Sequence, residues 1–426
     1  MHTNRQPRQI FWWSLFDFAN SIVVINLGLY FSQWIVIEQG VSEFWYNFVD
    51  VVVTILLLLT LPALGAISDM TNKKVLFLRL TSIPIFIFTL LIGFSSQTFS
   101  GFSPILITFL SFLFIIYFYQ LSLIFYHAML GDIAKRERYG TISGIGLAAG
   151  WIGGIVGLLI ILPFVKGDIP FFQPAGRIQA FIPCAIIFAV LIGISLTFLK
   201  EPQGVSSSTK KISVRQAYTK VWDDIKNLRK NPVIFYFLIA YWLFIDAILT
   251  IQDNSALYLE IVLNIPDQQK VLFGSLVLIM AAFGALILGR VGDKIGYIKT
   301  LTVIVFGWII ALVLFLQVES GWSLLLIGSL LGILFGGTWT ITRALYLVII
   351  PAAQRAEYFG FYGCTERFAS IIGPLVWSIF VVGLKDFGPV RYKVAVISMI
   401  VLIGISLFFL RKMHIYLKKG GQLIKA

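Results

Sequence analysis

Residues 51–74 read VVVTILLLLTLPALGAISDMTNKK, an apolar run that ends in a glycine, three further residues, an aspartate and a basic pair. A matching segment, GRVGDKIGYIK at 289–299, again places a glycine and an aspartate four residues apart and follows them with basic residues. Each segment follows the second long apolar run of its half of the chain. An internal repeat of this kind indicates two parallel duplicates within one chain.

Apolar runs of this length recur along all 426 residues, and each can cross a hydrocarbon core of roughly 30 Å as a helix. The chain is 58% hydrophobic and 12% charged, which is about half the charged share of a soluble domain. We therefore predict twelve transmembrane helices, at residues 11–36, 44–67, 75–96, 103–128, 141–164, 179–199, 233–260, 269–290, 298–317, 322–349, 358–383 and 389–412.

One long polar segment, 200–232, interrupts these runs, and it begins KEPQGVSSSTKK before a basic amphipathic stretch. The predicted fold class is therefore an all-α membrane protein with two six-helix halves. The halves are residues 1–199 and 233–426, and the cytoplasmic linker between them is 200–232.

The net charge of +13 is explained by where the basic residues fall. With both termini and the linker in the cytoplasm, 25 of the 33 Lys and Arg lie in cytoplasmic segments. This bias predicts an N-in, C-in orientation under the positive-inside rule. Because the cytoplasmic segments account for the positive charge, we do not expect the protein to bind nucleic acid. Of the other eight, Arg343 and Arg367 lie deep inside predicted helices. Six lie in outside loops or at the outer ends of helices, namely Lys166, Arg177, Lys270, Lys385, Arg391 and Lys393.

The repeated segment resembles the loop motif of the major facilitator superfamily, a glycine, three residues, an aspartate and a basic cluster. Met70 stands where that family usually has an arginine. The resemblance implies a segment that braces the cytoplasmic face and changes partners as the halves rock, which suits a carboxylate that holds a group in one state and releases it in another. The matching positions are Gly65, Asp69, Lys73 and Lys74 in the first copy, and Gly289, Asp293, Lys294 and Gly296 in the weaker second copy.

Two further stretches resemble a narrower branch, the vacuole-effluxer or unidentified major facilitator group. The first is SLFDFANSIVVINLGLYF in the first helix, and the second runs from Gly336 to Pro374. The fungal members of this branch resemble amino-acid exporters of the vacuole. The superfamily resemblance also implies that helices one, four, seven and ten line a central cavity. The second stretch matches through Gly336, Gly337, Arg343, Pro351, Glu357, Phe359, Gly360, Tyr362, Gly373 and Pro374.

Charged groups at membrane depth are costly and usually functional. In the first helix, Asp17, Asn20 and Ser21 share one helical face, either as a cavity-lining site or gate or as a polar patch that braces neighbouring helices. In the fourth helix, Gln120 and His127 lie seven residues apart on one face.

Helix ten carries Trp339, Arg343 and Tyr346 on one face. We hypothesise that Arg343 approaches Asp17 when the cytoplasmic side is closed. The alternative is a structural bond between Arg343 and Glu366. The adjacent pair Glu366 and Arg367 is expected to serve packing or gating.

Helix seven carries Asp246 and Thr250 on one face. Burial disfavours the charged form of a carboxylate, so Asp246 is the first candidate for a protonatable group. The alternative is a carboxylate that simply hydrogen-bonds a neighbouring helix.

We expect a secondary carrier or facilitator of a small polar solute, with protons as the candidate coupling ion, amino-acid export as the leading function and no cofactor. Efflux of drug-like or siderophore-like molecules and lipid translocation are the alternatives. The three histidines form no metal-binding pattern and the chain has no Gly-Lys-Ser phosphate loop, so we expect neither an enzyme nor an ATP-driven pump. A monomer in the inner membrane of a bacterium is the predicted setting, with an organelle membrane as the alternative.

Overall fold

The computed structural model describes residues 5–98, 103–169, 176–201, 214–318, 321–369 and 371–419. Within these residues every regular element is a helix. Twelve helical segments among them are long and apolar enough to cross a membrane. The prediction of an all-α chain with twelve spanning segments is confirmed.

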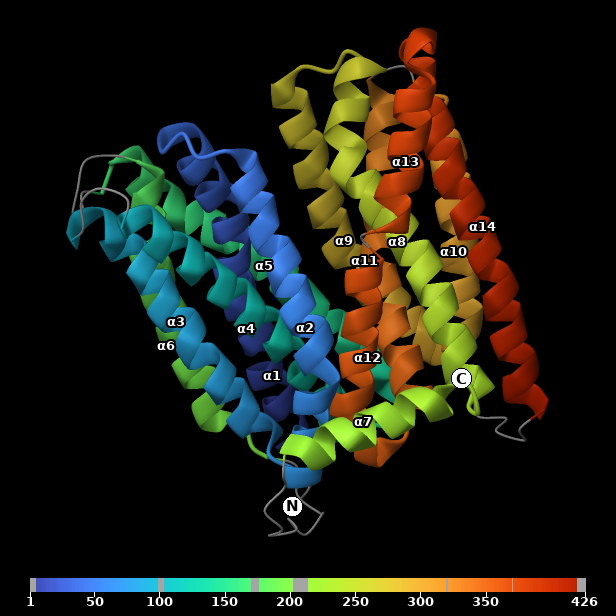
Figure 1. The fold of residues 1–426 in the computed structure, drawn as a ribbon. Coiled ribbons are helices and arrows are strands. Elements are labelled where there is room, and N and C mark those ends of the chain that lie inside the picture. The colour runs from blue at the N-terminus through green and yellow to red at the C-terminus, as the bar shows by residue number, and fades with distance from the viewer. Residues whose placement is uncertain are drawn as a thin grey trace. The chain divides into compact units, whose positions relative to one another are not determined.

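The first six spans come from the N-terminal part of the chain (Figure 1). The first combines α1 (Arg5–Asn26) with two π-helical turns, Leu27–Phe31 and Trp34–Glu38. The next five are α2 (Glu43–Thr71), α3 (Lys74–Thr98), α4 (Ser103–Ile133), α5 (Tyr139–Lys166) and α6 (Phe181–Phe198).

The short amphipathic helix α7 (Val214–Leu228) follows and is not a candidate span. The remaining spans are α8 (Pro232–Ile261), α9 (Asp267–Ile295), α10 (Tyr297–Phe315), α11 (Trp322–Ile349), α12 (Arg355–Phe368) with α13 (Ile372–Gly383), and α14 (Val390–Lys419).

Several helices run further than the apolar pattern predicts. Helix α4 ends at Ile133 rather than 128, and α9 ends at Ile295 rather than 290. Hydropathy marks where a helix leaves the apolar layer, whereas backbone hydrogen bonding continues into polar surroundings. Asp69 and Asp293 of the repeated segments therefore lie on the last turns of α2 and α9, and the prediction that these aspartates follow the helices in loops was wrong. Gly65 and Gly289 lie within the helices, as the predicted ranges have them.

The eleventh span is a broken helix rather than the single helix 358–383 predicted from sequence. Helix α12 ends at Phe368 and α13 begins at Ile372. The Gly373-Pro374 pair in the sequence predicts a bend in one continuous helix at this point, and not an interruption. Pro374 lies in the first turn of α13, where its missing N–H leaves no helical hydrogen bond unmade. The proline therefore begins a half-helix instead of bending a continuous one.

Packing divides the chain into two compact units. Unit 1 comprises Met1–Lys135, Ala149–Tyr218 and Ala353–Gly360. Unit 2 comprises Arg136–Ala148, Thr219–Ala352 and Phe361–Ala426. The first turns of α5 thus pack with the second part of the chain, and those of α12 pack with the first.

Glycines let helix backbones approach closely within each unit. In unit 1, a Cβ on Gly153 of α5 would collide with the backbone of Phe18 in α1. In unit 2, a Cβ on Gly336 of α11 would collide with the carbonyl of Ala281 in α9. These pairs fix the helices that carry the polar residues of the candidate site.

Candidate functional site

Asp246 of α8 lies deep in unit 2, with 1% of its surface exposed. Its Oδ2 accepts a hydrogen bond of 2.7 Å from the backbone N–H of Gly373. Gly373 is the second residue of α13, so the carboxylate caps the N-terminus of the half-helix that follows the break. The partial positive charge of that terminus stabilises the carboxylate in its charged form.

The second carboxylate oxygen of Asp246 lacks a comparable hydrogen bond. Its Oδ1 is buried and has no hydrogen-bond partner among the residues that the structure describes. The nearby Thr250 hydroxyl donates to the Asp246 carbonyl at 2.7 Å, within the same helix. A Cβ on Gly373 would meet both Thr250 Oγ1 and Asp246 Oδ1. The site thus joins a buried acceptor to a backbone position where only glycine fits.

A second polar cluster of unit 2 surrounds Glu366 on α12. The Tyr241 hydroxyl of α8 donates to its carboxylate, and the Trp339 side chain of α11 is also hydrogen-bonded to it. The Tyr241 ring stacks on Tyr362 with centroids 4.3 Å apart. The Tyr362 hydroxyl in turn lies 3.0 Å from Thr342 Oγ1. Glu366 is therefore held by aromatic donors.

Arg343 of α11 lies beside this cluster with 2% of its surface exposed. Its Nε donates to the Trp339 carbonyl at 3.0 Å, while its Nη2 is buried without a hydrogen-bond partner in the described ranges. Its positive charge acts on Glu366 and Tyr362. The structure thus gives Glu366 the hydroxyl of Tyr241 and the indole of Trp339, and it leaves one guanidinium nitrogen of Arg343 available.

Tyr346 and Arg367, the other predicted residues near Arg343 and Glu366, lie close to this cluster. Tyr346 is fully buried, and its ring stacks on Phe237 with centroids 5.2 Å apart. Arg367 is half-buried and acts electrostatically on Glu366. The structure therefore brings Trp339, Arg343 and Tyr346 together with the Glu366–Arg367 pair.

The candidate residues of unit 1 pack between helices. A Cβ on Gly150 of α5 would lie 2.7 Å from Asp17 Oδ2 and 3.0 Å from Ser21 Oγ. Asn20 donates to Ser122 Oγ of α4 at 3.0 Å. Gln120 is half-buried on the same helix, two residues before Ser122. The hypothesis that Asp17 approaches Arg343 concerns two units and stays a prediction.

The first repeated segment holds the N-terminus of α12 within unit 1. Asp69 Oδ2 accepts from the backbone N–H of Glu357 at 2.9 Å. A Cβ on Gly65 would collide with the carbonyl of Ala356, so the glycine permits a close backbone approach. Lys73 is exposed, whereas Lys74 is buried and lies 4.0 Å from Asp69. Gly65 and Asp69 together hold the first turn of α12 against α2.

An ion-pair network that the sequence did not indicate extends this contact. Lys74 Nζ lies 2.8 Å from one oxygen of Asp132, and Arg355 Nη1 lies 2.7 Å from the other. Asp132 belongs to α4, and Arg355 is the first residue of α12. The segment GDIAKRE at 131–137 carries charges beyond the apolar run. It does not indicate that Asp132 pairs with Arg355, which lies more than 200 residues further along the chain.

The second repeated segment does the same for the N-terminus of α5 within unit 2. Asp293 accepts from the backbone N–H groups of Gly140 and Thr141, each at 2.8 Å. Gly289 packs so closely on Gly140 that a Cβ on either would collide with the other's carbonyl. Tyr297 donates to Asp293 at 2.7 Å, and Lys294 is exposed. Both copies thus cap the helix that begins beside them.

Comparison with known proteins gives a consistent picture. The family model described as "Vacuole effluxer Atg22 like" matches residues 44–421. The MFS-type transporter YxiO of Bacillus subtilis is 26% identical over 393 residues, which cover 86% of this chain and 87% of that protein. Autophagy-related protein 22 of Kluyveromyces lactis is 18% identical over 259 residues, which cover 56% of this chain. The match spans 52% of that fungal protein.

Solved structures show the same fold. A bacterial homologue of the iron transporter ferroportin superposes with a TM-score of 0.72 at 14% identity, covering 96% of this chain and 99% of that one. The proton:xylose symporter XylE superposes with a TM-score of 0.68 at 13% identity, covering 96% of each chain. The predicted superfamily and branch are confirmed: this multi-pass membrane protein is a transporter rather than an enzyme, and it belongs to the Atg22-like vacuole effluxer family of the major facilitator superfamily.

Proposed function

We propose that the protein exports a small polar solute in exchange for protons by alternating access, with amino acids as the first solute class to test. The buried Asp246 carboxylate carries this proposal, because one of its oxygens is capped and the other is free. Burial favours the neutral carboxyl group, whereas the terminus of α13 favours the anion. A carboxylate held between these two influences is suited to gaining and losing a proton as α13 moves.

The solute site of the proposal is the cluster around Arg343 and Glu366. The free Nη2 of Arg343 suits an acceptor on the solute, above all a carboxylate. The Glu366 carboxylate suits a solute ammonium group, and the stacked rings of Tyr241 and Tyr362 add an apolar wall. We assign Asp17, Asn20 and Gln120 to the pathway wall.

Asp69 and Asp293 are assigned to gating. Each holds the first turn of another helix by backbone hydrogen bonds, which form or break as a unit when that turn moves. The proposed orientation places these contacts at the cytoplasmic face, with both termini inside. A bacterial inner membrane is the proposed location.

The test is solute flux in proteoliposomes that contain the purified chain and an internal pH dye. A panel of amino acids is supplied, and wild type is compared with Asp246→Asn. Solute flux that moves protons, and that disappears in the variant, supports the proposal. Flux without proton movement would make the protein a facilitator and Asp246 a packing group. Absence of flux for every amino acid, from folded protein, would redirect the search to drug-like molecules, siderophores and lipids.

A further inference from the structure

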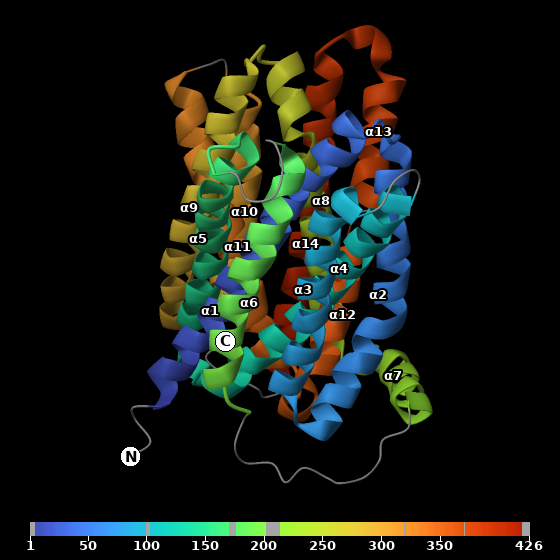
Figure 2. The ribbon, with the colours of Figure 1, turned by 90° about the vertical axis from the view of Figure 1, so that its left-hand side faces the viewer.

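A groove lies between α3 and α6 on the surface of unit 1. The two helices run side by side (Figure 2). Its volume is about 330 Å³, near the lower end of pockets that hold small ligands. It is separate from every candidate residue of the transport site. The lining residues are Arg79, Ser82, Ile83, Phe86, Phe188, Ala189, Ile192, Gly193, Leu196 and Thr197.

The helix faces that flank the groove are exposed and apolar. On α3, exposed Leu80, Ile83 and Ile87 follow one another at three- and four-residue spacing. On α6, exposed Val190 and Ile194 repeat at four-residue spacing. Apolar stripes of this kind cover a helix face that contacts acyl chains. The groove between them is thus open to lipid tails.

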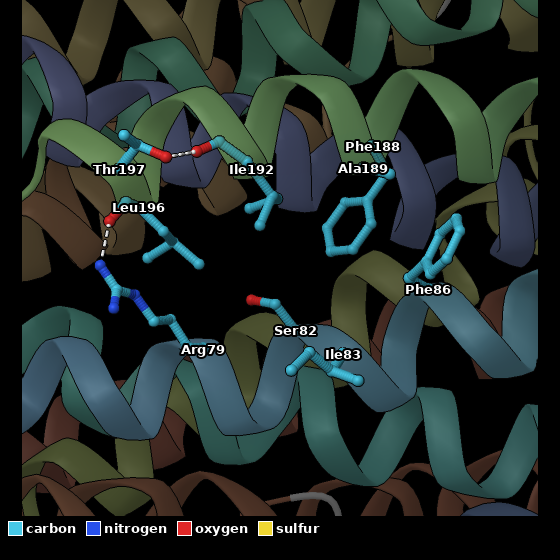
Figure 3. Close-up of a pocket in the computed structure, with 10 residues that line it drawn as sticks. Arg79, Ser82, Ile83, Phe86, Phe188, Ala189, Ile192, Leu196 and Thr197 are labelled. Carbon is cyan, nitrogen blue, oxygen red and sulfur yellow. Dashed lines mark hydrogen bonds between the residues drawn. The ribbon is translucent and has the colours of Figure 1, made fainter.

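One end of the groove is polar (Figure 3). Arg79 lies there, and its Nη2 donates to the Leu196 carbonyl at 2.7 Å. That carbonyl is left over at the end of α6, because the N–H of Lys200 donates to Gln9 Oε1 instead. Arg79 is exposed, and the described part of the chain offers its other guanidinium nitrogens no hydrogen bond. Phe86 and Phe188 lie at the opposite, apolar end.

Charges of both signs lie near the polar end, where the Glu201 carboxylate accepts from the backbone N–H groups of Val75 and Leu76. Basic residues outnumber it. Gln9 hydrogen-bonds both the Phe198 carbonyl and the Lys200 N–H, which brings its exposed neighbour Arg8 to the end of α6. Lys200 is exposed as well. The seven residue steps from Arg79 to Phe86 span about 10 Å along the helix, which is the reach of a headgroup with the upper part of its chain.

We propose that this groove binds an anionic phospholipid. The lipid phosphate pairs with the free N–H groups of Arg79, and Arg8 and Lys200 favour a headgroup with net negative charge. One acyl chain lies between α3 and α6 along Ser82 and Ile192 toward Phe86. The site is independent of the solute and of proton coupling. A structural role for Arg79 alone, as a cap on the end of α6, is the competing explanation.

The test is native mass spectrometry of the full chain in detergent, with phosphatidylglycerol or phosphatidylcholine added. Gly193 lines the groove, and no atom lies within 4 Å of its added Cβ position, so Gly193→Leu places a side chain at the groove without a collision of its Cβ. Gly404→Leu on α14 is the matched control, since that glycine has equally open surroundings. Arg79→Gln removes the charge.

We expect wild type and Gly404→Leu to retain phosphatidylglycerol in preference to phosphatidylcholine. Gly193→Leu should lower bound phosphatidylglycerol at least about fivefold, and Arg79→Gln should abolish the preference. Equal binding of both lipids by wild type, or unchanged binding by Gly193→Leu, would overturn the proposal. If Arg79→Gln does not fold, Gly193→Leu decides the matter.

Discussion

Asp246 and Asp293 are both carboxylates of unit 2 that cap the N-terminus of a helix from another part of the chain. Asp293 accepts hydrogen bonds from two backbone N–H groups, a threonine hydroxyl and the Tyr297 hydroxyl. Asp246 accepts one, from Gly373, and keeps a buried oxygen without a partner in the described residues.

We propose that the difference separates a structural brace, Asp293, from a group that changes its protonation state, Asp246. Four hydrogen bonds to the Asp293 carboxylate fix the start of α5. Native proteins seldom leave a buried polar atom without a hydrogen bond. We therefore expect the free oxygen of Asp246 to bind a proton, to contact a ligand or to gain a partner when a helix moves. The variants below test whether function and stability divide between the two carboxylates in this way.

Asp246→Asn should produce the largest effect. The amide oxygen still accepts from Gly373, so the fold survives, but the group no longer takes up a proton. We expect proton-coupled flux to fall by about a hundredfold, equivalent to about 2.7 kcal/mol. Asp253→Asn, an exposed carboxylate seven residues further along α8, is the control and should transport normally. Proton movement that persists in Asp246→Asn would reduce Asp246 to a second structural cap.

Asp293→Ala should act on stability instead. The substitution leaves the N–H groups of Gly140 and Thr141 unpaired and removes the cap of α5. We expect a loss of about 2 kcal/mol, at the upper end of the range for helix caps. The measurement is thermal unfolding of the purified protein in detergent, with exposed Lys294→Ala as control. An unchanged unfolding temperature would show that the two carboxylates do not divide as we argue.

Arg343→Lys tests the solute site of the same unit. Lysine keeps the positive charge but loses the planar fork that pairs with a carboxylate. We expect the KM for a transported amino acid to rise about tenfold, equivalent to about 1.4 kcal/mol. Arg367→Lys, which alters the other cation near Glu366, should change KM little. Wild-type kinetics in Arg343→Lys would leave Arg343 as a purely structural neighbour of Glu366.

The fold was predictable because hydropathy reports the apolar layer directly. Twelve apolar runs became twelve spans, and Trp322–Ile349 has the predicted ends. Helix ends that lie outside the layer were missed, as at Ile133 of α4, since a helix continues in polar surroundings without an apolar signal. The break before Ile372 was missed because Gly373 and Pro374 indicate a disturbance but not which side of them the helix stops.

The candidate site was predictable only as separate residues. Asp246 and Arg343 are conspicuous because charges are rare in apolar runs. Their partners were not predictable, since nearly every residue has a backbone N–H and the sequence does not show that the one of Gly373 contacts Asp246. Tyr241 was missed for a related reason: an aromatic residue in a membrane helix is ordinary until Glu366 is placed beside it.

Tyr241→Phe should have the smallest effect and decides which of the two carboxylates Glu366 resembles. The variant removes the hydroxyl that donates to Glu366 but keeps the ring that stacks on Tyr362. One hydrogen bond contributes about 1 kcal/mol. A fall in unfolding temperature with unchanged KM would make Glu366 a brace like Asp293. An altered KM with unchanged stability would place Glu366 with Asp246. Tyr258→Phe on the same helix is the control, because the buried Tyr258 hydroxyl has no hydrogen-bond partner in the described chain and its loss should cost nothing.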